Sequence, residues 1–174
     1  MERYKAAEII ELTGITKMQL NHWINMGAIK PAEDDSRRGG VRYFSKENLF
    51  EALVCKYLNA HRLPVQTILG VVLNISNPAP HRRRKSFFKT FKDNQKLGDY
   101  FLIAAHLTFY AKGGIKKDFL SSKQELPESE KKKIYELGRY IEACPADKLS
   151  ENLSKYPTAI VVNLTSIAKE AINM

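Results

Sequence analysis

Apolar side chains recur at helical spacing from the start of the chain. Ala6, Ile9 and Ile10 stand at i, i+3 and i+4, with acidic residues on the other side, which predicts a short amphipathic helix over 5–12. Gly14 follows this helix and can adopt the left-handed backbone conformation that closes a helix. The pattern therefore predicts a helix that ends in a tight turn.

The helical spacing resumes directly after the turn. Leu20, Trp23 and Ile24 repeat it, and Thr16 in front of them is a good N-cap, so a second helix is predicted over 17–26. Two short helices joined by a three- or four-residue turn with a glycine have the geometry of a helix-turn-helix, in which the second helix enters the major groove of DNA.

The pattern then becomes more varied. A polar loop is predicted over 32–40, a short strand over 41–44, and a helix that begins with Ser45 as its cap. Pro64 suits the first turn of a fourth helix, because a missing N–H costs nothing there, and apolar residues over 68–72 continue that helix. The loop between two short extended pieces is typical of a wing, so the order is helix, turn, helix, wing, helix, helix.

The second half of the chain mixes helical and strand patterns. The elements expected are a basic amphipathic helix over 85–97, a buried strand over 100–110 with a return strand over 115–119, helices over 130–144 and 147–156, a strand covered on both faces over 159–164, and a helix over 166–172. A helix over 100–110 is the alternative at this length. The predicted fold class is mixed: a mainly-α winged helix-turn-helix followed by a small α/β or α+β module.

Charge divides the chain into three parts. The 174 residues carry a net charge of +9, and residues 77–98 alone hold seven basic and one acidic side chain. The segment opens with Asn77-Pro78-Ala79-Pro80, which a helix cannot cross. We expect a DNA-binding domain over 1–76, a basic linker or connector helix over 77–98, and an effector or interaction module over 99–174. The basic run is either a solvated linker or a strip that faces phosphates or RNA polymerase.

Several classes of protein do not fit this sequence. Cys55 and Cys144 are too far apart for a metal knuckle or a redox pair, and the histidines lack ligand spacing. No phosphate-cradling glycine loop and no nucleophile–base–acid motif occurs, so we expect no metal, no cofactor and no enzyme activity. No apolar run approaches the ~20 residues of a spanning helix. The start of the chain is amphipathic, unlike a signal core, and a cytoplasmic protein without membrane contact is expected.

Five pieces of the N-terminal half, in this order and spacing, resemble the mercury-resistance regulator (MerR) family of winged-helix transcription factors. The resemblance covers about residues 2–75, and an excisionase-like winged helix shares it. The pieces are Ala6-Ala7-Glu8-Ile9 with Thr13-Gly14-Ile15-Thr16; Leu20-Asn21-His22-Trp23; Gly27-Ala28-Ile29-Lys30-Pro31; Gly40-Val41-Arg42-Tyr43-Phe44-Ser45; and Leu63-Pro64-Val65-Gln66-Thr67-Ile68.

The resemblance implies that the second helix lies in a major groove while the wing touches the neighbouring backbone and minor groove. The DNA-binding candidates are Lys17, Asn21, His22, Trp23, Arg37, Arg38, Arg42 and Tyr43. Trp23 also falls on the Leu20 face of its helix, so a core tryptophan is the alternative. On a short strand either Arg42 or Tyr43 faces DNA while the other packs inward.

The sequence departs from the family pattern in three places. Asn21-His22-Trp23-Ile24 stands where the family commonly has Arg-Tyr-Tyr-Glu, so base preference does not transfer. Asn77-Pro78-Ala79-Pro80 stands where the long dimer-forming helix would begin, so a homodimer stays open but not through such a coiled coil. The metal-binding cysteines of metal-responsive members have no counterpart.

The function expected from the resemblance is that of a bacterial DNA-binding transcription regulator. Its partner is double-stranded DNA, and residues 99–174 would receive RNA polymerase, a small molecule or a protein effector. The alternative is an architectural or recombination accessory protein that uses the same winged helix.

Overall fold

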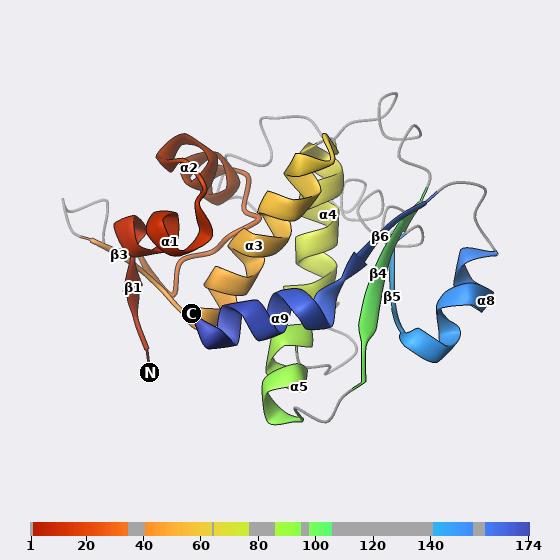
Figure 1. Ribbon diagram of the computed structural model, residues 1–174. Coiled ribbons are helices and arrows are strands. Elements are labelled where there is room, and N and C mark those ends of the chain that lie inside the picture. The colour runs from red at the N-terminus through yellow and green to blue at the C-terminus, as the bar shows by residue number, and fades with distance from the viewer. Residues whose placement is uncertain are drawn as a thin grey trace, which may run out of the picture.

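The computed structural model describes residues 2–34, 41–63, 65–76, 86–94, 98–105, 141–154 and 159–174. These residues are mostly helical and include two small antiparallel sheets at opposite ends of the molecule (Figure 1). Long helices fill the space between the two sheets (Figure 1).

The two N-terminal helices are confirmed. Helix α1 spans Ala6–Thr13 and α2 spans Lys17–Asn25. Gly14 has φ 69° in the turn, a conformation that side chains with a Cβ disfavour. The Thr16 hydroxyl accepts a hydrogen bond from the Gln19 N–H at 3.1 Å and caps α2, as expected.

A three-stranded antiparallel sheet lies beside these helices in the order β1-β3-β2. Strand β3, Arg42–Phe44, confirms the predicted strand, and it pairs with β1, Tyr4–Lys5, and with β2, Glu33–Asp34. The polar residues of β2 were expected to form a loop. Pairing with β3 holds them extended, because tertiary context overrides weak strand propensity.

Helix α3 spans Lys46–Ala60 and α4 spans Val65–Ser76, both in agreement with the sequence pattern. Ser45 caps α3 by accepting a hydrogen bond from the Asn48 N–H at 3.3 Å. Pro64 and residues 77–85 lie outside the described residues, so their predicted roles remain predictions.

The predicted basic helix is present as α5, Phe87–Asp93, which is shorter than the expected 85–97. Its aromatic rings pack against α3: the centroid of Phe88 lies 5.3 Å and that of Phe87 lies 6.0 Å from the ring of Phe50. Phe88 and Phe91 are buried core side chains and Phe87 is partly buried against the same cluster, so these rings attach the helix to the core.

The second sheet has the order β5-β4-β6, and both pairings are antiparallel. Strand β4, Tyr100–Ala105, confirms the start of the expected strand, while residues 106–140 lie outside the described part. Strand β6 spans Ala159–Asn163. It lies at an edge of the sheet as described and Val161 is 39% exposed, so the expectation of cover on both faces is wrong.

The predicted helix over 130–144 is contradicted at its end, in the residues that the structure describes. Residues expected to end a helix over 130–144 form β5, Ile141–Pro145. Pairing with β4 along its whole length supplies hydrogen bonds that a short helical pattern does not reveal. A short 3-10 helix, Ala146–Lys148, and α8, Leu149–Leu153, follow and agree in part with the helix expected over 147–156.

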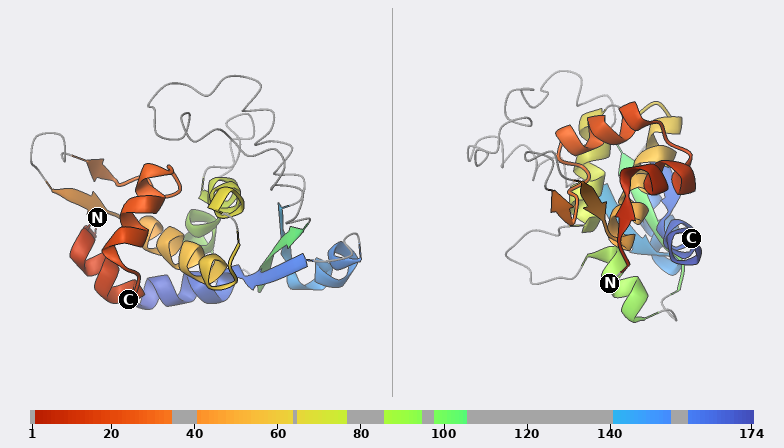
Figure 2. Two further views of the ribbon diagram at one scale, coloured as in Figure 1. Left: turned by 90° about the horizontal axis from the view of Figure 1, so that it is seen from above. Right: turned by 90° about the vertical axis from the view of Figure 1, so that its left-hand side faces the viewer.

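The last helix, α9, spans Leu164–Asn173 and returns across the molecule to the N-terminal elements (Figure 1, Figure 2). It packs along α3, with Leu164, Ile167, Ala168 and Ala171 buried in the same apolar cluster as the side chains of α1 and α3. The chain ends near α1 and β1, although α9 begins at the sheet on the other side.

Polar contacts fix α9 on α3. The Tyr57 hydroxyl donates to a Glu170 carboxylate oxygen at 2.8 Å, and the Lys46 ammonium donates to the Ile172 carbonyl at 2.9 Å. One apolar cluster thus spans both predicted domains. The boundaries proposed at 76 and 98 stay predictions.

Truncation of a buried side chain on α9 tests how closely the two halves are coupled. Ile167 is 4% exposed, so Ile167→Ala should lower the free energy of unfolding by about 3 kcal/mol through lost burial and a cavity. Trp23, the single tryptophan, lies in the N-terminal core and reports on that half by fluorescence, while circular dichroism reports on the whole chain.

We expect both signals to shift together in urea unfolding. Lys169→Ala, a change on the exposed side of the same helix, is the control and should alter neither signal by more than about 0.5 kcal/mol. A fluorescence transition that stays in place in Ile167→Ala would show that the N-terminal region folds without α9.

Candidate nucleic-acid interface

The outer face of α2 is polar and open. Its residues line a depression of about 550 Å³, and they are Lys17, Met18, Asn21, His22 and Asn25. Three of the predicted DNA-binding residues are therefore brought together: Lys17 and His22 are exposed and Asn21 is half-buried. The inner face of α2 holds Leu20 and Trp23, which are almost completely buried.

Trp23 does not belong to this open face. Its side chain is 2% exposed and packs in the apolar cluster, three positions from Leu20 on the same side of the helix. A buried ring is not available to lie against a sugar, so the placement of Trp23 at the DNA surface is wrong and the alternative, a core tryptophan, is correct.

The sheet contributes two more of the predicted residues. Arg42 and Tyr43 are both half-buried on β3, whereas the following Phe44 is fully buried. Both side chains therefore keep some exposed surface, and which of them faces a duplex stays a prediction. Arg37 and Arg38 lie outside the described residues, and their role stays a prediction.

Each acidic side chain of β2 is paired with an arginine. The Arg42 Nε–H donates to Asp34 Oδ1 at 3.3 Å, and Arg3 lies 2.9 Å from Glu33 in a second ion pair. Both pairs are solvent-exposed, so each adds little to stability. Their effect on the surface is to offset two carboxylates that would repel a phosphate backbone.

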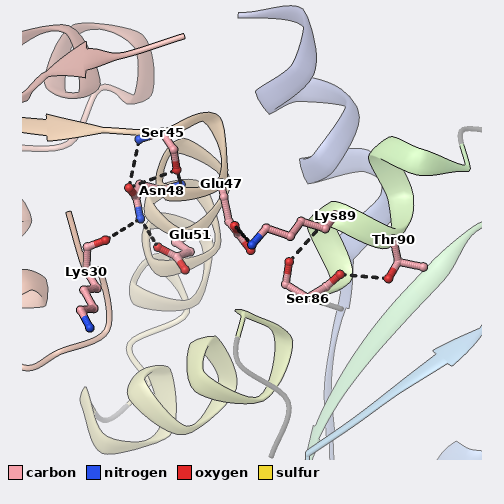
Figure 3. Close-up of polar contacts among 8 residues, drawn as sticks. All are labelled: Lys30, Ser45, Glu47, Asn48, Glu51, Ser86, Lys89 and Thr90. Carbon is pink, nitrogen blue, oxygen red and sulfur yellow. Dashed lines mark hydrogen bonds and ion pairs between the residues drawn. The ribbon is translucent and has the colours of Figure 1, made fainter. Parts of the chain in front are cut away.

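Asn48, near the start of α3, holds the β2–β3 segment at both of its ends (Figure 3). Its Oδ1 accepts from the Ser45 N–H at 3.0 Å, directly after β3. Its Nδ2 donates to the Lys30 carbonyl at 3.0 Å, just before β2, and to Glu51 Oε2 at 2.8 Å. The buried Asn48 amide thus connects three parts of the chain: Lys30, which follows α2; Ser45, which follows β3; and Glu51 in the core.

Glu51 is a buried carboxyl group with 7% exposure. Burial raises its pKa from 4.5 to about 7, while the hydrogen bond from Asn48 acts in the opposite direction. Two charges act on it from nearby: the Glu47 carboxylate raises its pKa and the Lys89 ammonium of α5 lowers it. These two groups also pair with each other at 3.3 Å (Figure 3).

Asn48 and Glu51 were not singled out from the sequence. The spacing Ser45-x-x-Asn48 was an available signal, because a polar residue three positions after a cap can complete a capping box. Nothing local distinguishes Glu51 from a solvated glutamate, because its burial depends on α4 and α5.

Other kinds of site receive no support in the described part of the chain. No group of three or more histidine, cysteine or acidic side chains is arranged there to hold a metal ion. Among the helices described, none has both the length and the apolar character needed to cross a membrane.

Two short helices in a tight corner, with an outward polar face on the second, define a helix-turn-helix. Residues 4–73 match the family model described as MerR HTH family regulatory protein. The N-terminal part of the chain is therefore similar to a MerR helix-turn-helix, as the resemblance predicted, and the matched family is one of DNA-binding regulators. No curated protein matches the chain.

Replacement of Glu51 tests the buried carboxyl group. Because its pKa is higher in the folded chain than the ordinary 4.5, its contribution to stability is full below about pH 4.5 and is lost as the pH rises towards 7. Glu51→Gln does not titrate and can still accept the hydrogen bond from Asn48. The stability of Glu51→Gln relative to wild type should therefore rise by about 3 kcal/mol between acidic and mildly alkaline pH.

Urea unfolding followed by Trp23 fluorescence at several pH values measures this difference. Glu11→Gln removes an exposed carboxylate that is not among the groups acting on Glu51, and it should retain the wild-type dependence of stability on pH. If the free energies of unfolding of wild type and Glu51→Gln change in parallel with pH, the pKa of Glu51 is not raised in the folded protein.

Proposed function

We propose that the protein is a bacterial DNA-binding transcription regulator that places α2 in the major groove and uses the β2–β3 hairpin as a wing on the backbone and minor groove. The observation that carries this proposal is the match of residues 4–73 to a regulatory helix-turn-helix family, together with the polar outer face of α2. The net charge of +9 favours a polyanionic partner.

The arrangement of α2 suits this role. Lys17 stands in its first turn, where a cation can contact a phosphate, and Asn21 lies one turn further along the same face. The buried Leu20 and Trp23 anchor the helix from behind, so its outer side chains are presented by a rigid support.

The hairpin offers cations beside α2. Both lie at the same end of the molecule (Figure 1, Figure 2). Arg42 has five N–H donors, and its Nε–H donates to Asp34 Oδ1 at 3.3 Å. Arg37 and Arg38 fall between β2 and β3 in the sequence, where the tip of a wing would carry phosphate contacts.

Residues 99–174 would receive the signal, from RNA polymerase, a small molecule or a protein effector. Support comes from α9, which links the second sheet to the first residue of α3 through the Lys46–Ile172 hydrogen bond. Any homodimer would form through surfaces other than a long coiled coil.

Selection from a pool of random duplexes tests the proposal against its alternative. A regulator should enrich one sequence element and bind it at least about 1,000-fold more tightly than random duplexes at moderate salt. An architectural or recombination accessory protein should bind all duplexes with similar affinity and the same salt dependence. The absence of duplex binding at low salt would end both hypotheses.

Two substitutions separate backbone contacts from base contacts. Arg42→Ala should weaken binding to all duplexes by a similar factor and reduce the slope of log K against log salt by about 1. Asn21→Ala should change the preferred base at one position, with a discrimination of about 1–3 kcal/mol lost there. Fluorescence anisotropy on the selected element and its single-base variants measures both effects.

Asp34→Ala is the matched control for the hairpin. It removes the ion pair with Arg42 but keeps the cation, so it should bind DNA at least as tightly as wild type. If Asp34→Ala weakens binding as much as Arg42→Ala, the arginine acts through the fold of the hairpin. If Arg42→Ala and Asn21→Ala behave alike, the placement of α2 is wrong.

A further inference from the structure

Met18 is the most exposed large hydrophobic residue in the part of the chain that the structure describes. Its side chain is 79% exposed, against 47% for Val41 and 39% for Val161. A single exposed apolar side chain is ordinary on a protein surface. This one lies on the outer face of α2 among polar and charged neighbours, where a bound duplex would cover it.

Met18 forms a ridge with two asparagines. Met18, Asn21 and Asn25 stand at i, i+3 and i+7 on α2, and all three line the open depression. Residues at this spacing lie on one side of a helix. The outermost side chains of the ridge are therefore one thioether and two amides, and the sequence of α2 contains no arginine.

These side chains match the edges of A·T base pairs. In the major groove adenine presents an acceptor at N7 and a donor at N6, which an asparagine amide satisfies with two hydrogen bonds. Thymine presents a C5 methyl group, whose natural contact is an apolar side chain. Guanine is usually recognised by arginine or lysine, and Lys17 stands in the first turn of α2, where phosphate contacts are typical.

We propose that α2 reads A·T base pairs, with Met18 packed against a thymine C5 methyl group and Asn21 hydrogen-bonded to an adjacent adenine. The proposal rests on the proposed function and names the sequence class that this face recognises. The spacing is consistent with it, since three residues of helix rise about 4.5 Å and successive bases are about 3.4 Å apart. Asn25 would then lie about two base pairs further along.

Replacement of thymine by deoxyuridine tests the methyl contact directly, because it removes only the C5 methyl group. Full-length protein would first be used to select its preferred element from random duplexes. Each thymine of that element would then be replaced singly, and affinity measured by fluorescence anisotropy. We expect wild type to lose about fourfold in affinity at one thymine, the effect of one buried methyl group.

The variant Met18→Ala completes the comparison. It should bind the original element more weakly than wild type and show no further loss when that thymine becomes deoxyuridine. Lys17→Ala is the control: it should weaken binding to all elements and retain the wild-type loss at the deoxyuridine position. Because Met18 is exposed, Met18→Ala should unfold at the wild-type urea concentration, which separates loss of contact from loss of fold.

The outcomes distinguish this inference from the proposed function. A selected element whose contacted positions are G·C pairs would overturn the A·T preference and leave the regulator intact. Equal losses on deoxyuridine replacement in wild type and Met18→Ala, or no loss in either, would overturn the methyl contact. Failure to select or bind any duplex would instead overturn the proposed function.

Discussion

The burial of α3 is the constraint on which the rest of the structure depends. Nine of its fifteen residues are buried, and they face in every direction around the helix. A helix whose side chains are buried on all sides must be enclosed by other elements. Helices α1, α4, α5 and α9 supply that enclosure, so segments from both ends of the chain meet on one element. The helix-turn-helix is thus supported from behind by residues that lie far away in the sequence.

The same burial explains why the polar side chains of Asn48 and Glu51, near the start of α3, are joined by a hydrogen bond. A buried carboxyl or amide without partners carries a large desolvation cost, and the Asn48 amide donates both to the Glu51 carboxyl group and to the backbone carbonyl of Lys30. Because Lys30 precedes the hairpin and Ser45 follows it, the satisfaction of these core groups also sets where the hairpin leaves and rejoins the helices. The candidate wing is consequently positioned by the core.

Local signals were sufficient for the elements that build the N-terminal region. Thr16 and Ser45 cap their helices, and the apolar spacing around Leu20 marks the buried side of α2. Features that depend on distant partners were not predictable. The sequence of β5 has helical spacing and that of β2 is polar, and both are extended because they pair with β4 and β3. The buried face of α2 was predictable in part, because Leu20 and Trp23 lie on the same side of the helix. The burial of Glu51 was not predictable from the sequence.

The position of α9 has a consequence for how the chain is synthesised. Ala60 ends α3 more than a hundred residues before Leu164 begins α9. At about 5–20 residues per second, the nascent chain displays the surface that α9 will occupy for roughly 5–20 s before its cover emerges from the ribosome. During that interval the growing polypeptide offers chaperones an uncovered apolar surface, and the helix-turn-helix gains the support of α9 only after the interval has passed.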